Sequence, residues 1–137
     1  MELLRWKARF SVLWLTMAIG TAAWVLFSVL TPGAIEDIMA GEWLTVEISE
    51  GFMVVHAIMF LIPLIVAILC LTLNRTANRW LNFIVGIIWV LMFIYNIIIA
   101  ATGGNTILIA GWLMTIAGLV VSALIAWFAW TWPKQEA

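Results

Sequence analysis

Apolar residues run along this chain in stretches long enough to cross a lipid bilayer, and short polar segments separate them. A helix needs about 20 apolar residues for such a crossing. The stretch that begins at Trp80 is too long for one helix, and the turn signal "TGGN" at residues 102–105 divides it. The pattern therefore predicts four transmembrane helices, over residues 10–30, 52–73, 80–101 and 107–130.

Composition supports lipid as the solvent of this fold. The chain has 137 residues, of which 66% are hydrophobic and 9% are charged, whereas about 25% of the residues in a soluble domain are charged. Residues 80–133 contain no Asp, Glu, Lys, Arg or His. Helices satisfy their own backbone hydrogen bonds in lipid, and short connections favour antiparallel neighbours. We therefore expect one all-α, integral membrane domain over residues 1–137, an antiparallel four-transmembrane-helix bundle.

The charges of the connections predict the orientation of this bundle. Positive charges favour the cytoplasmic side of a membrane. The connection over residues 31–51 contains five acidic residues and no basic one, so we expect it outside and both termini in the cytoplasm. The first apolar stretch follows a basic segment, as in a signal peptide, but it is long enough to span and lacks a cleavage site. We expect it to be retained. All six basic residues then lie inside: Arg5, Lys7, Arg9, Arg75, Arg79 and Lys134.

The acidic outer connection also contains a helical pattern. Pro32 suits the start of a helix and Gly41 its end. Between them Ile35, Ile38 and Met39 share one face. This pattern predicts a short amphipathic helix on the outer membrane surface or over the end of the bundle, and a solvated loop is the alternative.

Each predicted transmembrane helix carries a stripe of polar and small residues. Residues three, four and seven apart share a helix face, and polar groups in lipid turn toward the bundle interior. Small residues there allow helices to approach closely. The expected interhelical packing residues are Gly20, Asn82, Gly86, Gly111, Gly118 and Ser122.

His56 is the only histidine of the chain, and it lies within the second apolar stretch. If the second and third helices form a hairpin, His56 lies opposite Asn96, and Cys70 lies opposite Asn82. Imidazole and carboxamide groups can exchange a hydrogen bond, so we expect His56 to bond Asn96 across the two helices. His56 is then either a structural histidine or part of a ligand-binding or proton-handling site.

A pocket beside His56 would open toward the outer side. Pro63 removes a helical hydrogen bond and can kink the second helix. A hairpin of the third and fourth helices places Phe93 opposite Thr115 and Gly86 opposite Ser122. The candidate pocket residues are His56, Asn96, Thr115, Phe27, Pro63 and Trp89.

The chemical inventory excludes several functions. No Asp or Glu lies in any predicted span, so a proton-coupled exporter would lack its carboxylate. One histidine cannot provide bis-histidine haem ligation, although a haem or pigment with His56 as single ligand stays open. Zinc catalysis needs at least three protein ligands. We expect no catalytic residues, no metal and no resident cofactor, and the near-balanced charge gives no indication of nucleic acid. The chain is not expected to be an enzyme.

Four segments together resemble a family of small bacterial four-helix membrane proteins of unassigned function. These segments are "RFSVLWLTMAIG", "TPGAIEDIMAG", "IPLIVAIL" and "ANRWLNFIVGI". The resemblance implies the bacterial inner membrane and the four-helix fold. In that family, acidic residues often occur near the end of the first helix and before the second-helix proline, where this chain has residues such as Trp24 and Leu61.

Two functional hypotheses follow. The leading one is a non-enzymatic bundle that acts by association, as a homo-oligomer or as an accessory subunit of a larger membrane complex. The absence of a reactive set and bulky lipid-facing stretches such as "WVLMF" favour it. The alternative is a transporter or binding protein for a small, mostly apolar ligand in the outward-facing pocket near His56.

Overall fold

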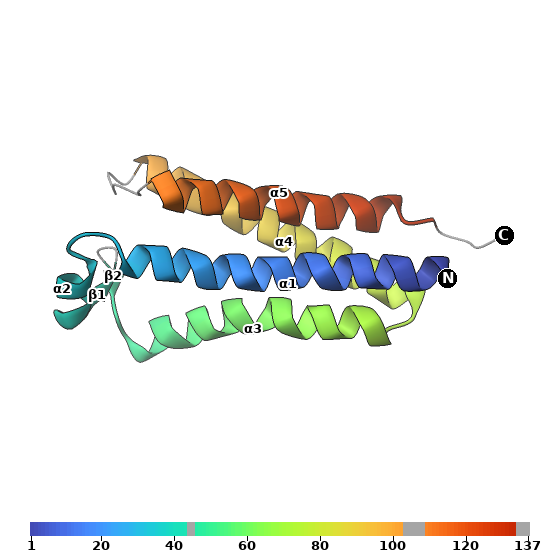
Figure 1. The fold of residues 1–137 in the computed structure, drawn as a ribbon, viewed down its shortest axis with the longest axis horizontal. Coiled ribbons are helices and arrows are strands. Elements are labelled where there is room, and N and C mark those ends of the chain that lie inside the picture. The colour runs from blue at the N-terminus through green and yellow to red at the C-terminus, as the bar shows by residue number, and fades with distance from the viewer. Residues whose placement is uncertain (44–45, 103–108, 134–137) are drawn as a thin grey trace.

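The computed structural model describes residues 1–43, 46–102 and 109–133, and four long helices dominate it (Figure 1). They lie side by side, and each runs opposite to the long helix before it. By length and composition all four can cross a membrane, so the chain is an all-α membrane protein. Residues 103–105 of the predicted turn, the predicted helix start at residue 107 and Lys134 lie outside the described residues. The long helices are α1 (Glu2–Val29), α3 (Glu50–Thr72), α4 (Arg75–Thr102) and α5 (Ile109–Thr131).

Two of these helices begin before their apolar stretches. α1 begins at Glu2 and α4 at Arg75, several residues ahead of the predicted starts. Asn74 explains the start of α4, because its Oδ1 accepts a hydrogen bond from the backbone N–H of Ala77 (2.9 Å). Asparagine is among the best residues at this position. The hydrophobic pattern therefore marks the apolar part of each helix, and capping residues mark its end.

The connection after α1 folds into a small unit of its own. It contains the predicted short helix, α2 (Ala34–Met39), followed by two short antiparallel strands, β1 (Glu42–Trp43) and β2 (Val46–Glu47). Gly41 has φ +86° and makes the turn between α2 and β1, a conformation that glycine adopts without strain. Met39 is 84% exposed, so the apolar face of α2 is not covered by the bundle. The strand pair was not predicted.

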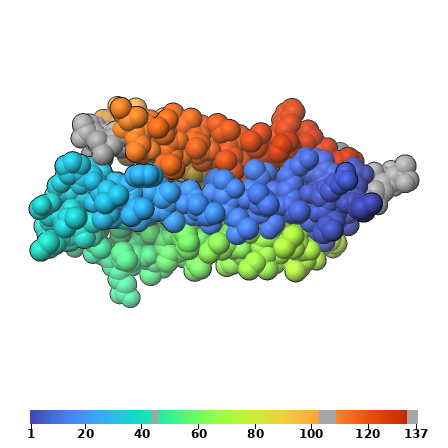
Figure 2. Space-filling model, viewed as in Figure 1, coloured from blue at the N-terminus to red at the C-terminus, as the bar shows by residue number. Residues whose placement is uncertain are grey.

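Helices that follow one another in the sequence are not always the ones that pack together. α1 packs along both α3 and α5, and α4 packs along α5. In Figure 1 α1 lies between α3 and α5, while α4 crosses behind them. Figure 2 shows the side chains of α1 meeting those of α5 on one flank and α3 on the other. α3 and α4 make few contacts with each other, so their prediction as close neighbours along their length is wrong.

A dense core fills the half of the bundle that contains the start of α1 and the end of α5. We call this the sealed half. Phe10 and Trp132 are buried there with ring centroids 5.4 Å apart, and Trp6 stacks on Trp132 at 5.5 Å. The other fully buried large side chains of this half are Trp14, Ile125, Asn78, Asn82, Cys70 and Ser122.

Asn82 is the centre of a buried hydrogen-bond network in the sealed half. Its Oδ1 accepts from the indole Nε1–H of Trp14 (2.6 Å), and its Nδ2 donates to Asn78 Oδ1 (2.6 Å). It also contacts the Cys70 sulfur at 3.3 Å, which confirms the predicted pairing of Cys70 with Asn82. Asn78 Nδ2 donates to the Cys70 carbonyl (2.5 Å). The network joins α1, α3 and α4 at the ends where α3 and α4 connect.

Candidate functional site

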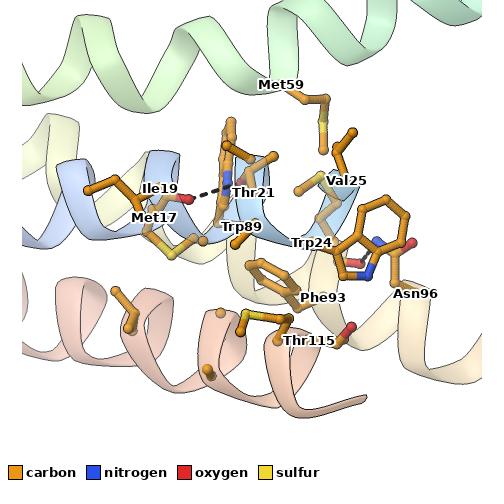
Figure 3. A pocket seen from close by; sticks show the side chains of 18 of the residues that line it. Met17, Ile19, Thr21, Trp24, Val25, Met59, Trp89, Phe93, Asn96 and Thr115 are labelled. Carbon is orange, nitrogen blue, oxygen red and sulfur yellow. Dashed lines mark hydrogen bonds between the residues drawn. The ribbon is translucent and has the colours of Figure 1, made fainter. Parts of the chain in front are cut away.

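A cavity of about 670 Å³ lies in the other half of the bundle, between α1, α3, α4 and α5. We call this the cavity half. The volume is within the range of small-molecule sites, about 300–1,000 Å³. Figure 3 shows side chains from several helices turned toward this space. Its wall is mostly apolar and contains one methionine from each long helix: Met17, Met59, Met92 and Met114.

Two glycines set how closely α4 approaches α5. A Cβ on Gly118 would lie 2.3 Å from Cζ of Phe93, so the Phe93 ring lies directly on this glycine. A Cβ on Gly86 would lie 3.1 Å from the backbone nitrogen of Ala126. Small residues of this kind let membrane helices pack closely. α4 packs closely on α5 and makes few contacts with α3, and the cavity lies between the four long helices.

The observed α4–α5 register is displaced by about one turn from the predicted one. Phe93 lies against Gly118 instead of Thr115, and Gly86 lies against Ala126 instead of Ser122.

Most polar side chains in the cavity wall donate their hydrogen bonds within their own helix. The Thr16, Thr21 and Thr115 hydroxyls and the Asn96 amide each donate to the carbonyl four residues earlier. The four donor–acceptor distances are 2.9, 3.0, 2.9 and 2.9 Å. Their oxygen atoms keep lone pairs that can accept from a ligand. The wall is therefore apolar with a few acceptors.

His56 lies in the cavity wall, but it does not bond Asn96. Its Nδ1 donates to the carbonyl of Phe52 (2.9 Å), and its ring packs on Phe52 (centroids 4.1 Å apart) and Trp43 (5.5 Å). The predicted His56–Asn96 hydrogen bond is therefore wrong. The helix hairpin fixes proximity only at the connected ends, and α3 and α4 have separated at this level.

Trp43 of the β1 strand packs against side chains of α1 and α3 at the end of the cavity half. Its ring contacts Trp24 of α1 (5.9 Å) as well as Phe52 (5.7 Å) and His56 of α3. The indole nitrogen of Trp43 is buried without a hydrogen-bond partner in the described chain. These four rings tie the connection to α1 and α3. No local pattern in the sequence predicts these contacts of Trp43, because they depend on the unpredicted strand pair.

Trp89 lines the cavity from the middle of α4 (Figure 3). It is 4% exposed, and its ring meets the Trp14 ring edge-on at 5.8 Å and 86°. Trp14 uses its N–H to bond Asn82. The Trp89 nitrogen has no hydrogen bond to any residue in the described ranges. It is nevertheless not among the nitrogens sealed inside protein atoms, and the residue is part of the cavity wall.

The structure brings four of the six candidate pocket residues to this cavity. His56, Asn96, Thr115 and Trp89 line it. Phe27 is 40% exposed and Pro63 is buried, and neither belongs to the described wall. The wall residues that the sequence reasoning missed include Met59 and Met92. Each lies three residues after a candidate, His56 or Trp89, and so one turn along the same helix face.

The predicted packing residues have different surroundings. Asn82, Gly86, Gly118 and Ser122 lie in helix contacts or are buried. A Cβ on Gly20 would meet nothing within 4 Å, and Gly20 lines the cavity. The Gly111 carbonyl accepts the Thr115 hydroxyl. Gly20 therefore leaves space instead of close packing.

Metal-ligating side chains do not gather in the part of the chain that the structure describes. No group of three or more His, Cys, Asp and Glu side chains there could hold a metal ion. His56 is the one imidazole of the chain, and its Nε2 has no partner in the described ranges. The expectation of no resident cofactor stays a prediction, with axial ligation of a pigment or haem by His56 as its alternative.

Comparison with known proteins identifies the family. A family described as "Family of unknown function (DUF6326)" matches residues 1–137. The chain belongs to this family. Neither the curated proteins nor the solved structures contain a match to it. This match confirms the resemblance to a family of unassigned function. The cavity is the feature of this chain that bears most directly on its function.

Proposed function

We propose that the protein binds a small, mostly apolar molecule in the cavity between its four long helices. The observation that carries this proposal is the 670 Å³ cavity inside a chain of lipid-crossing helices. Ligand sites are typically concave, mostly apolar and equipped with a few polar groups. The methionines suit a wall that adapts to its ligand, because their side chains are flexible and polarisable. The role is non-enzymatic, as binding or as a step of transport.

The proposed setting is the bacterial inner membrane, with both termini in the cytoplasm and the cavity half toward the outside. Basic residues support this orientation. Lys7 donates to the Leu71 carbonyl (3.2 Å) and Arg79 to the Ala129 carbonyl (3.1 Å), both at the sealed end. Cations near helix C-termini are also favourable for the helix dipole. A membrane-impermeant maleimide on intact cells should label Glu36→Cys and spare Glu2→Cys, and the reverse result would contradict this orientation.

Photolabelling with adamantyl diazirine, an apolar probe, tests the binding proposal. We expect saturable labelling of cavity-wall peptides from α3, α4 and α5, and non-saturable labelling of lipid-facing peptides. Gly118→Ala supplies the matched variant, because its Cβ would push the Phe93 ring into the cavity. Gly20→Ala is the control, since a Cβ there meets nothing within 4 Å.

We expect Gly118→Ala to reduce the saturable labelling at least about fivefold and Gly20→Ala to keep most of it. Labelling that never saturates in the wild-type protein would overturn the proposal. Equal saturable labelling in the wild-type protein and in folded Gly118→Ala would also overturn it, since the probe would then bind outside the cavity.

Association is the second candidate function, as a homo-oligomer or as an accessory subunit. The observation in its favour is the flank between α3 and α4, where two long apolar helices make few contacts with each other. A helix of a second copy could lie there. Native mass spectrometry from lipid nanodiscs distinguishes the two functions. A monomer with saturable labelling supports ligand binding, and a stable oligomer that protects wall peptides supports association.

A further inference from the structure

The cavity wall contains one deeply placed hydrogen-bond donor without a partner, the indole N–H of Trp89. The side chain is 96% buried and stands near the midpoint of α4 (Arg75–Thr102). The hydroxyl donors of the wall are bonded within their own helices, and Asn96, which donates one N–H to the Met92 carbonyl, is exposed rather than deeply placed. At this depth of a bilayer there is no bulk water to satisfy the indole.

Trp14 shows how the same fold treats an indole that has no access to the cavity. The two rings touch edge-on at 5.8 Å. The N–H of Trp14 donates to Oδ1 of Asn82 at 2.6 Å, and the Asn82 side chain is fully buried. A buried donor without an acceptor is costly, and the protein provides an acceptor for Trp14. Trp89 has no such acceptor in the described chain, its nitrogen is not sealed inside protein atoms, and the residue lines the cavity.

We propose that the ligand of this cavity carries a carbonyl oxygen that accepts a hydrogen bond from Trp89 Nε1. This inference rests on the proposed function and names the chemical class of its ligand. The rest of the molecule is apolar and fills the space between the aromatic and methionine side chains of the wall. A flat aromatic quinone and a flexible acyl ketone or ester share this chemistry.

Competition against adamantyl diazirine compares each carbonyl probe with its own hydrocarbon. The flexible pair is undecan-2-one and undecane, and the flat pair is 2-methyl-1,4-naphthoquinone and 2-methylnaphthalene. Concentrations are expressed per lipid in nanodiscs, so that partitioning into the bilayer does not enter the ratio. We expect one carbonyl probe to compete about tenfold better than its hydrocarbon, as one hydrogen bond to an otherwise unpaired buried donor allows. A preference in the undecan-2-one pair would indicate a flexible ligand, and a preference in the naphthoquinone pair would indicate a flat one.

Trp89→Phe is the decisive variant, because it keeps an aromatic ring and removes the N–H. We expect it to reduce the carbonyl preference to about onefold while the hydrocarbon still competes. Trp127→Phe is the matched control. Trp127 of α5 is 63% exposed and does not line the cavity, so the preference should persist.

The indole ¹⁵N–¹H NMR signal of Trp89 gives an independent readout. It should move downfield when the carbonyl probe binds and stay in place with the hydrocarbon. Equal competition by carbonyl and hydrocarbon in both pairs would overturn the inference while leaving apolar binding intact. A preference that survives Trp89→Phe would also overturn it. Failure of all four probes to compete, together with non-saturable labelling, would instead overturn the proposed function.

Discussion

The sealed half and the cavity half are built from the same four helices, yet they treat polar groups differently. In the sealed half Asn82 links Trp14, Asn78 and Cys70 across three helices. In the cavity half Asn96, on the same helix, bonds only the Met92 carbonyl of its own backbone and is exposed. A polar residue in an apolar helix therefore makes interhelical hydrogen bonds only where another helix lies close to it.

Glycines show the same contrast between the halves. Gly86 lies against the Ala126 backbone, while a Cβ on Gly20 would meet nothing within 4 Å. Small side chains allow close approach, but they enforce it only where two helices already pack. The helices of the sealed half are thus closely packed, and those of the cavity half leave open space between them.

The largest effect is expected from removing the centre of the buried network. Asn82→Ala leaves the Trp14 N–H without its acceptor and Asn78 Oδ1 without its donor, so the free energy of unfolding should fall by about 2–3 kcal/mol. Asn96→Ala is the matched control and should change it by less than about 0.5 kcal/mol. Unfolding in mixed micelles of mild detergent and SDS measures both. Equal losses of unfolding free energy in Asn82→Ala and Asn96→Ala would contradict the proposed difference between the two halves.

A methyl group at the α4–α5 contact should have the next largest effect. Gly86→Ala puts a Cβ 3.1 Å from the Ala126 backbone nitrogen, and backbone cannot move aside as a side chain can. We expect a loss of about 1–3 kcal/mol, measured by the same unfolding assay. Gly20→Ala should be near neutral. A neutral Gly86→Ala would mean that α4 and α5 are less tightly packed than the structure has them.

The two touching tryptophans should differ in their contribution to stability without added ligand. Trp14→Phe loses the bond to Asn82 and should cost about 1–2 kcal/mol. Trp89→Phe has a similar loss of packing volume but removes an N–H that has no partner in the described chain, so its cost should be about 1 kcal/mol smaller. Thermal unfolding of both variants, followed by the helix signal in far-UV circular dichroism, measures the difference. A larger loss for Trp89→Phe would show that its indole already has a structural partner.

The smallest effect is expected at the only histidine. His56→Phe keeps an aromatic ring between Phe52 and Trp43 and loses one hydrogen bond within its own helix. The free energy of unfolding should change by less than about 0.5 kcal/mol. The same variant tests pigment ligation, because the visible absorption of protein from its native membrane should not depend on His56. A visible band that His56→Phe abolishes would establish ligation.

Much of the fold was predictable from the hydrophobic pattern. In a membrane each helix satisfies its own backbone, so the length of an apolar stretch indicates a helix without knowledge of its neighbours. The short helix between Pro32 and Gly41 was also predictable from local signals. Cys70 and Asn82 could be paired because the connection between α3 and α4 is short and they lie close to it.

The pairing of His56 with Asn96 failed because it lies far from that connection. A connection restricts the distance between helix ends, while the crossing angle depends on which surfaces pack best along the whole length. Gly86 and Gly118 hold α4 on α5, and the resulting angle takes Asn96 away from α3. The α4–α5 register likewise differs from the predicted one by about one turn, because it depends on which side chains pack against Gly86 and Gly118.

The sequence by itself determined that this chain forms long helices for lipid, where they divide, and that polar residues would be few. Those properties are local and follow from composition and period. Only the tertiary structure decided that one half is sealed and the other holds a cavity, and that Trp14 has an acceptor while Trp89 does not. The reason is that both outcomes depend on the angle at which whole helices cross, to which many weak side-chain contacts contribute together.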